Sequence, residues 1–261
     1  MSHPFVPRVG GVLSADIAVP DHARAVQFYS RVLSTGAEPL WREDTLMSSL
    51  GMPIIGLGAR TPELEHLPVQ WMPHIQVADV SESVSRAVEG GGVELVHARG
   101  EDGSSQWAVL LDPDGAAFGL IPVVPAGSGD AAEAGARPVG RIAWLDLTVA
   151  DAPATRDFYG RVVGWSIQEV AMESDGRSYA DFNMLGGDGA PAAGVCHARG
   201  VNRDLPPVWL LYLPVGDLAE SLRRVKSEGG RIVRVDPGVG GEPALAVIQD
   251  PAGAYVALAR Q

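Results

Sequence analysis

The chain has 261 residues, with 20 basic and 32 acidic side chains and a formal net charge of −12. This balance argues against binding to nucleic acid or to an anionic membrane surface, and it leaves neutral or cationic small molecules as easier partners. The single cysteine, Cys196, excludes an intrachain disulfide, and neither a membrane-spanning apolar run nor a signal-peptide pattern is present. We therefore expect a cytoplasmic protein that is a monomer or a homodimer.

The first predicted module begins with a strand at 12–19, where apolar residues alternate with others so that the strand has two different faces. Asp21 is expected to cap a helix that carries one apolar stripe and ends near 34–36. Three short strands are predicted at 40–41, 46–50 and 54–57. The module is therefore a strand, a helix and three strands.

The same pattern begins again at residue 71. Asp79 and Glu82 have the spacing of a capping box, and the helix that they open ends in glycines at 90–92. Strands are predicted at 93–97, 106–111 and 117–123. Before the last of them the sequence DPDG, 112–115, predicts a tight turn that is structural rather than catalytic. A run rich in Gly, Ala and Pro then predicts a linker at 125–138.

The second half of the chain repeats the first. Asp151 follows Asp21 by 130 positions. Asp250 follows Asp112 by 138 positions, and both Asp112 and Asp250 stand directly before a proline. Strands are predicted at 166–170, 179–185 and 192–196, and another capping box at Asp217 and Glu220. We interpret the chain as a tandem repeat of two domains, 1–124 and 139–261, each made of two modules.

The four modules resemble the vicinal oxygen chelate superfamily, which contains glyoxalase I, bleomycin-resistance proteins and extradiol dioxygenases. The resemblance rests on first strands that end V-x-D, on Phe-Tyr in two helices at 28–29 and 158–159, and on D-P-x-G before two last strands. It implies an α+β fold in which four βαβββ modules form two half-open barrels, with the ligand inside and the helices outside. Whether the second module pairs with the first or with the third stays open.

The resemblance also implies where a metal would bind. Metalloenzymes of this superfamily carry a His, Gln or Glu seven residues before the capping Asp, and a Glu near the end of the last strand. The residues at these positions here are Ser14, Met72, Trp144 and Leu210 in the first strands, and Gly56, Gly119, Gly194 and Ala257 in the last strands. A catalytic metal needs about three protein ligands, so we predict no metal and no other cofactor.

Other side chains are predicted to face the ligand. Strand alternation places Asp16, His74 and Asp146 on the inner faces of their strands, and we take these three as candidate acid–base residues. The alternative is that each Asp accepts hydrogen bonds from nearby backbone or an Arg, and that His74 is a core residue. The candidate ligand-binding residues are Ser14, Met72, Gln76, Trp107, Trp144, Thr148, Tyr212 and Tyr255.

The predicted pocket suits a flat aromatic ligand, held by stacking, with acidic groups that fix a cationic or hydroxylated part. Trp41 is expected among the aromatic walls, whereas Trp165 is expected in the core. The leading hypothesis is a metal-independent binding protein that sequesters an aromatic metabolite or antibiotic, as the bleomycin-resistance branch does. The alternative is a metal-independent tailoring enzyme (a lyase, cyclase or isomerase). A metal-dependent glyoxalase or dioxygenase would need ligands that the sequence lacks.

Overall fold

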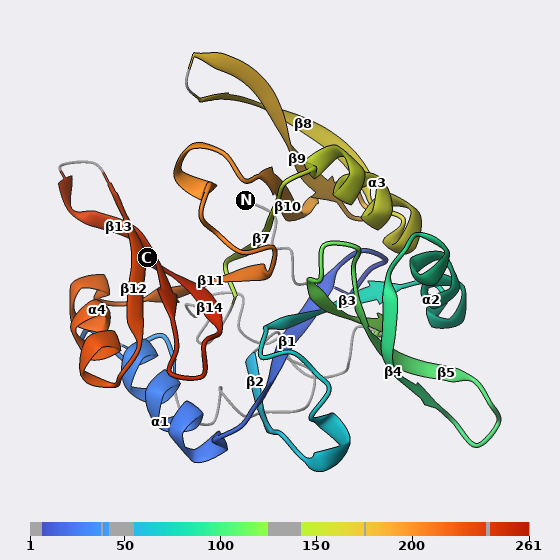
Figure 1. Ribbon diagram of the computed structural model, residues 1–261, viewed down its shortest axis with the longest axis horizontal. Coiled ribbons are helices and arrows are strands. Elements are labelled where there is room, and N and C mark those ends of the chain that lie inside the picture. The colour runs from blue at the N-terminus through green and yellow to red at the C-terminus, as the bar shows by residue number, and fades with distance from the viewer. Residues whose placement is uncertain are drawn as a thin grey trace. The chain divides into compact units, whose positions relative to one another are not determined.

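The computed structural model of the chain describes residues 7–37, 39–41, 55–124, 142–174, 176–238 and 241–260 (Figure 1). The predicted strand at 46–50 and residue 54 lie outside these ranges. Within them each module has one α-helix, and the helices are α1 (His22–Leu33), α2 (Val80–Glu89), α3 (Ala152–Val163) and α4 (Leu218–Ser227). Short 3-10 helices cover Pro62–Leu64 and Gly200–Asn202. In the part of the chain that the structure describes, no helix is long and apolar enough to cross a membrane.

The strands form two mixed sheets. The six-stranded sheet has the order β2-β1-β3-β6-β5-β4. Its strands are β1 (Val12–Val19), β2 (Ile55–Ala59), β3 (Met72–Val77), β4 (Val93–Arg99), β5 (Ser105–Leu111) and β6 (Ala117–Pro122). The eight-stranded sheet has the order β12-β13-β14-β11-β7-β10-β9-β8. Its strands are β7 (Trp144–Val149), β8 (Ser166–Ser174), β9 (Arg177–Leu185), β10 (Pro191–His197), β11 (Trp209–Val215), β12 (Arg231–Pro237), β13 (Pro243–Gln249) and β14 (Tyr255–Arg260). This architecture confirms the predicted α+β fold class with two half-open barrels.

Each helix begins where the sequence predicts, because a capping aspartate precedes it. One carboxylate oxygen of each cap accepts a hydrogen bond, at 2.8 to 3.0 Å, from the backbone N–H three residues later. These caps satisfy donors that the first turn of a helix cannot pair internally. The four capping residues are Asp21, Asp79, Asp151 and Asp217.

The prediction of a strand at 40–41 is wrong. Leu40 and Trp41 are buried but form no strand, and the carbonyl oxygen of Trp41 accepts a hydrogen bond from Ser34 Oγ at 2.9 Å. The indole N–H of Trp41 donates to the carbonyl of Pro214 at 2.7 Å. The apolar side chains are therefore explained by burial in a loop, which alternation over two residues cannot distinguish from a strand.

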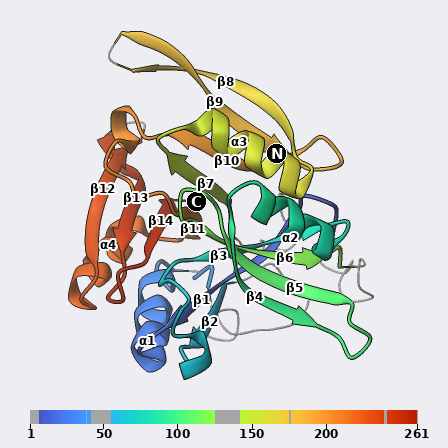
Figure 2. The same cartoon turned by 45° about the vertical axis from the view of Figure 1, so that its right-hand side comes forward.

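The structure contains two compact units. Unit 1 comprises Met1–Leu13, Met72–Ala126 and Trp144–Trp209, and unit 2 comprises Ser14–Trp71, Gly127–Ala143 and Leu210–Gln261. Unit 1 therefore joins the second and third modules, and unit 2 joins the first and fourth. In both views α2 lies beside α3 and α1 beside α4 (Figures 1 and 2). The division at 124 and 139 into two sequential domains stays a prediction, drawn from the repeat.

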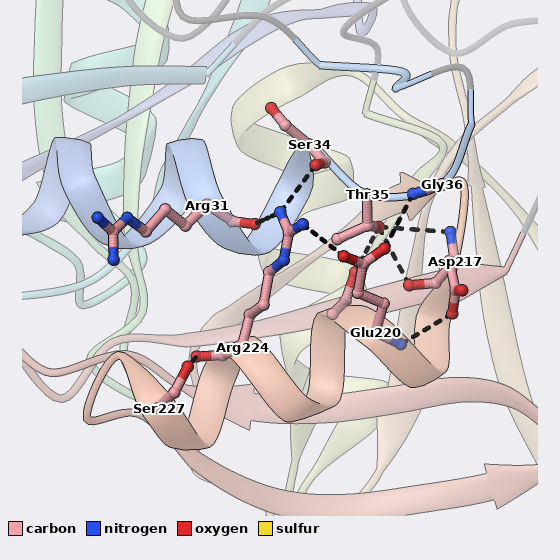
Figure 3. A network of polar contacts seen from close by, with 9 residues as sticks. Arg31, Ser34, Thr35, Gly36, Asp217, Glu220, Arg224 and Ser227 are labelled. Carbon is pink, nitrogen blue, oxygen red and sulfur yellow. Dashed lines mark hydrogen bonds and ion pairs between the residues drawn. The ribbon is translucent and has the colours of Figure 1, made fainter.

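Polar contacts join α1 to α4 in unit 2 (Figure 3). Arg224 on α4 donates hydrogen bonds to the backbone carbonyls of Arg31 at 2.8 Å and Ser34 at 2.9 Å. The hydroxyl of Thr35 donates to the carbonyl of Asp217 at 3.0 Å. The last carbonyls of a helix have no partner within it, so Arg224 satisfies groups at the end of α1.

A buried tyrosine connects the helix of the first module to the last turn of the fourth. The hydroxyl of Tyr29 donates to Asp250 Oδ2 at 2.9 Å and accepts from the indole N–H of Trp71 at 3.2 Å. Asp250 Oδ1 in turn accepts from the backbone N–H groups of Ala252 and Ala254. Burial raises the pKa values of both Tyr29 and Asp250. We name this set of three side chains the Trp–Tyr–Asp network of unit 2.

Unit 1 contains the same network. The hydroxyl of Tyr159 donates to Asp112 Oδ2 at 3.1 Å and accepts from the indole N–H of Trp209 at 3.1 Å. Asp112 Oδ1 accepts from the backbone N–H groups of Asp114 and Ala116. Burial raises the pKa of Asp112 to about 6. The prediction that DPDG forms a structural turn is confirmed, because its first aspartate closes the turn and anchors a helix of another module.

Candidate functional site

The predicted inner residues of each module lie side by side on two parallel strands. In every module the first strand pairs with the strand that carries the predicted Glu position of the metalloenzymes. The pairs are Asp16 with Gly56, His74 with Gly119, Asp146 with Gly194, and Tyr212 with Ala257. Each polar or aromatic side chain thus stands next to a residue with little or no side chain.

The glycines leave room for these neighbours. A Cβ atom added at Gly56 would lie 2.0 Å from Asp16 Oδ1, and one added at Gly194 would lie 2.0 Å from Asp146 Oδ1. At Gly119 it would lie 2.7 Å from Cδ2 of His74. Carbon and oxygen atoms do not approach so closely without a covalent bond. A larger residue at Gly56 or Gly194 would therefore force the neighbouring carboxylate out of its observed position.

The same arrangement decides whether a divalent cation fits. The superfamily's metal positions hold glycine, alanine, serine or large apolar side chains here, whereas a catalytic metal needs about three N, O or S ligands. Among the residues that the structure describes, no three His, Cys, Asp or Glu side chains are grouped so that they could hold a metal ion. The described residues therefore do not fit the metal centre of these enzymes.

In unit 1, strand β7 presents an aromatic ring that is fixed beside a carboxylate. The indole N–H of Trp144 donates to Asp146 Oδ1 at 2.7 Å, and both side chains are half-buried. Thr148, two residues further along the same face, is buried. The hydrogen bond restricts the rotation of the Trp144 ring, so a flat face next to a negative charge is available in one orientation.

Neighbouring strands add polar residues that the sequence interpretation missed. Cys196 on β10 pairs with Thr148 and therefore shares its face of the sheet. Burial, and then the carboxylates of Asp146 and Asp181, raise the pKa of the Cys196 thiol. Cys196 is therefore a neutral thiol near two carboxylates, which makes it a poor nucleophile.

Asp181 on β9 also binds the end of β10. Its Oδ1 accepts the backbone N–H of His197 at 2.9 Å and lies 3.0 Å from Nδ1 of the same residue. The ring of Tyr179 meets the imidazole edge to face, with centroids 5.4 Å apart. His197 pairs with Val149, so it belongs to the opposite face from Cys196. The sequence contained a signal for these polar residues, because Tyr179, Asp181 and Asn183 alternate with apolar residues in the predicted strand at 179–185 and therefore share one face of it.

The other predicted residues of unit 1 have different environments. His74 is half-buried, and Met72 is buried with 4% of its surface exposed. Gln76 is fully buried, where its amide donates to the carbonyl of Gly11 at 3.3 Å and accepts from the N–H of Val124 at 3.0 Å. Its side chain thus binds two backbone segments. Trp107 on β5 is 42% exposed.

In unit 2 the predicted residues come from strands β1, β11 and β14. Ser14, Asp16, Tyr212 and Tyr255 are all half-buried. The expectation that Trp41 lines the pocket is wrong, because this side chain is fully buried and bonded to the carbonyl of Pro214. The pairing of His74 with Asp16 or Asp146 as an acid–base couple stays a prediction.

Fold and site together define a class of protein, a tandem α+β chain of βαβββ modules in which small or large apolar residues stand at the positions of the superfamily's metal ligands. The model of the glyoxalase-like domain matches residues 13–121, and the model of the Glyoxalase/Bleomycin resistance protein/Dioxygenase superfamily matches residues 141–258. The chain belongs to this superfamily. As expected, Trp165 is a core residue, with 3% of its surface exposed.

Among curated proteins, the anthracycline biosynthesis protein DnrV of Streptomyces peucetius is 31% identical over 134 residues, which are 47% of each chain. The chain thus spans about half the length of the curated relatives that it matches. The 2,3-dioxygenase LapB from Pseudomonas sp. KL28 has a TM-score of 0.55 at 12% identity, covering 98% of this chain and 94% of LapB. The Mn(II)-bound glyoxalase from Novosphingobium aromaticivorans has a TM-score of 0.53 at 14% identity, covering 98% and 83%. At such identities these structures show the fold alone.

Proposed function

We propose that this protein binds an aromatic small molecule without a metal ion and thereby sequesters a metabolite or antibiotic. The observation that carries the proposal is Trp144, whose ring is fixed by its hydrogen bond to Asp146, the carboxylate that fills the space a side chain at Gly194 would need. A flat aromatic ligand gains stacking area on such a ring, and the carboxylate attracts a cationic or hydroxyl group that the ligand carries. The name of the relative DnrV refers to anthracycline biosynthesis, which supports a ligand among aromatic antibiotics or their precursors.

A titration of aromatic antibiotics against tryptophan fluorescence tests this proposal. Ligand stacked on Trp144 is expected to quench its emission, and Trp144→Ala is expected to weaken binding by about 1 to 3 kcal/mol, the range for an aromatic residue that anchors a ligand. Ile167→Ala is a suitable control, because Ile167 lies in the same module and is 42% exposed on the edge strand β8. Equal affinities of the two variants for every ligand that binds would place the ligand elsewhere.

The second candidate function is that of a metal-independent tailoring enzyme, such as a lyase, cyclase or isomerase. The positions of Asp16, His74 and Asp146 favour it, because each lies on a first strand beside a residue with no side chain. A positioned general acid or base contributes roughly 10² to 10⁴ to a rate, so Asp146→Asn would lower turnover about 100-fold while affinity is retained.

Product analysis after long incubation separates the two functions. A sequestering protein returns each aromatic ligand unchanged, and Asp146→Asn then lowers affinity modestly. Conversion of a ligand by the natural protein, lost in Asp146→Asn, Asp16→Asn or His74→Ala with affinity intact, would replace sequestration by catalysis as the function of this site.

A further inference from the structure

A separate group of polar side chains lies on the β4–β5 hairpin of unit 1, at the edge of the six-stranded sheet (Figure 1). Nε2 of His97 lies 2.9 Å from Oγ of Ser105, and Nδ1 of His97 lies 3.3 Å from Oε2 of Glu94. The side chain of His97 is buried, with 5% of its surface exposed, while Ser105 is half-buried and Glu94 is exposed. We name these three side chains the Glu–His–Ser row. A carboxylate, an imidazole and a hydroxyl in this order form the arrangement of an activated serine nucleophile.

Two irregularities of the strand ladder bring the row onto one face of the hairpin. The register shows one extra residue on β4, which is Leu95, and one extra residue on β5, which is Gln106. An extra residue shifts the side chains beyond it to the other face of the sheet. Glu94 and Ser105 therefore share a face with His97, whereas in a regular ladder both would point away from it.

The hairpin does not need polar residues at these positions. In the fourth module, β12 and β13 have the same two irregularities 138 positions later in the chain. The positions that correspond to the row hold Ile232, Val235 and Pro243 there. The same hairpin thus forms with apolar side chains, so its folding alone does not explain the Glu–His–Ser row of the second module.

The row lies on the opposite face of its sheet from the predicted inner residues. His97 pairs with Ala108, whereas Gly119, the neighbour of His74, pairs with Val109. Successive residues of a strand point to opposite faces, so His97 and His74 belong to different sides of the sheet. Chemistry at the row is therefore independent of the proposed binding of an aromatic ligand.

We propose that Ser105 is the nucleophile of an acyl-transfer site that hydrolyses small carboxylic esters, with His97 as general base and Glu94 as the residue that positions it. Oγ of Ser105 attacks the carbonyl carbon of the ester while its proton passes to Nε2 of His97. His97 gives this proton to the alcohol oxygen as the bond between that oxygen and the carbonyl carbon breaks, which leaves the acyl group on Ser105. A water molecule, deprotonated by His97, then releases the carboxylic acid, and the proton returns to Oγ.

Arg99 competes with Glu94 for the same atom of the imidazole. Nη2 of Arg99 lies 3.2 Å from Nδ1 of His97, the nitrogen that also faces Glu94. A guanidinium only donates, so with Arg99 as partner the proton of the neutral ring is on Nε2, which then cannot act as a base. A carboxylate only accepts, so with Glu94 as partner the proton is on Nδ1, and Nε2 is free to take the proton of Ser105. Glu94 and Arg99 therefore have opposite effects on the reactivity of Ser105.

Ser104 provides a control within the same molecule. It precedes Ser105, it is exposed, and its hydroxyl donates to Asp102 Oδ1 at 2.6 Å and not to a histidine. The folded protein is treated with a fluorophosphonate, which reacts with an activated serine and loses fluoride, and the labelled peptides are identified by mass spectrometry. We expect Ser105 to react about 100-fold faster than Ser104, within the contribution of a positioned base. Equal rates at the two serines would overturn the proposal.

Substitutions then test the role of each group. Hydrolysis of p-nitrophenyl acetate should be lost in Ser105→Ala and retained in Ser104→Ala, and equal hydrolysis by these two variants would also overturn the proposal. Glu94→Gln should slow the labelling of Ser105 about tenfold or more, and Arg99→Gln should speed it, because the two changes favour opposite tautomers. Nitrogen NMR of the His97 imidazole measures the tautomer directly. Slower labelling in both variants, with an unchanged tautomer, would show that the two side chains only support the hairpin and would contradict the proposed positioning.

Discussion

The carboxylates of Asp16 and Asp146 occupy space that any side chain at Gly56 or Gly194 would need. A half-buried carboxylate keeps part of its hydration, and Asp146 also accepts the Trp144 indole N–H, so a charge on an inner strand is tolerated. The glycines are thus required by their neighbours and not by the backbone, since neither Gly56 nor Gly194 has a positive φ. A larger residue at Gly56 or Gly194 would displace the carboxylate of the neighbouring aspartate.

A pair of alanine substitutions on β2 tests this explanation. Gly56→Ala is expected to lower the free energy of unfolding by about 1 to 2 kcal/mol, because the new methyl group forces Asp16 from its position. Gly58→Ala is the control, since its Cβ would meet only the carbonyl of Ile17 at 3.6 Å, and it should change stability by less than about 1 kcal/mol. Urea denaturation of both variants provides the comparison. Indistinguishable midpoints would show that Asp16 moves without cost.

At the scale of residues, strand alternation led to the prediction of Asp16, His74 and Asp146 as inner-face residues, whereas the positions of Gly56, Gly119 and Gly194 came from the resemblance to the superfamily. Alternation assigns faces within one strand only, so the pairing that sets each of these side chains beside a glycine is known from the structure. Alternation also places Asp181 on one face of its strand, but it could not predict the contact of this carboxylate with His197, which depends on how β9 and β10 align. Trp41 was misplaced for a similar reason, since its partner Pro214 is 173 positions away.

The helices and turns meet in the two Trp–Tyr–Asp networks. Each network uses one hydroxyl as both donor and acceptor, so that a buried indole N–H and a buried carboxylate oxygen are satisfied together. Removal of the hydroxyl would leave both groups without a partner in an apolar environment, which costs more than the hydrogen bonds themselves contribute.

Tyr29→Phe and Tyr159→Phe are therefore expected to destabilise the protein by about 1 to 3 kcal/mol each. The effects should be similar, because the two hydroxyls have equivalent partners at 2.9 to 3.2 Å. Tyr255→Phe is the control, since Tyr255 lies half-buried at the start of β14, outside both networks. Thermal denaturation measures all three. A loss as large for Tyr255→Phe as for the other two would contradict a special role for the networks.

The pKa of Asp112 predicts a pH dependence of stability. Burial raises this pKa from its ordinary value of 3.8 to about 6, so the folded state binds the proton more tightly than the unfolded state. The resulting stabilisation is fully present below about pH 4 and is lost as the pH rises through about 6. The contribution of Asp112 should make the free energy of unfolding about 1 kcal/mol larger at pH 5 than at pH 7.

Asp112→Asn removes this titration. The amide keeps the oxygen that accepts from the N–H groups of Asp114 and Ala116, although it opposes the Tyr159 hydroxyl. The variant should be less stable than the natural protein at pH 5, and the difference should shrink by about 1 kcal/mol at pH 7. Urea denaturation at the two pH values gives the difference. A difference that does not change with pH would show that Asp112 titrates alike in both states.

At the scale of elements, local chemistry explains which predictions succeeded. The helix caps could be predicted because an aspartate and the N–H that it binds are three residues apart. The D-P-x-G turns could be predicted because their hydrogen bonds are equally local. That these turns also bind Tyr29 and Tyr159 could not be predicted, since the partners lie in other modules. The pattern of apolar and turn residues within one module does not specify which other module packs against that module.

The whole molecule repeats one module four times, and none of the eight residues at the superfamily's metal positions, all of them within the described part of the chain, is a usual ligand of a divalent cation. We expect less than about 0.1 divalent cation per purified chain, because glycine, alanine and apolar side chains occupy the positions that need about three ligands. A chelator should leave the melting temperature unchanged. Elemental analysis and a thermal scan with and without chelator are the measurements. One cation per chain, with a fall in melting temperature on its removal, would refute the prediction.

The spacing of the two networks along the chain has a consequence for biosynthesis. Tyr159 and Asp112 are separated by 47 positions, whereas Tyr29 and Asp250 are separated by 221. A ribosome adds about 5 to 20 residues per second, so α1 leaves it roughly 10 to 40 s before its aspartate exists. During that interval the apolar stripe of α1 has no α4 to cover it. Chains that stall late in translation would therefore be substrates for chaperones, and the speed of the last codons would influence the yield of folded protein.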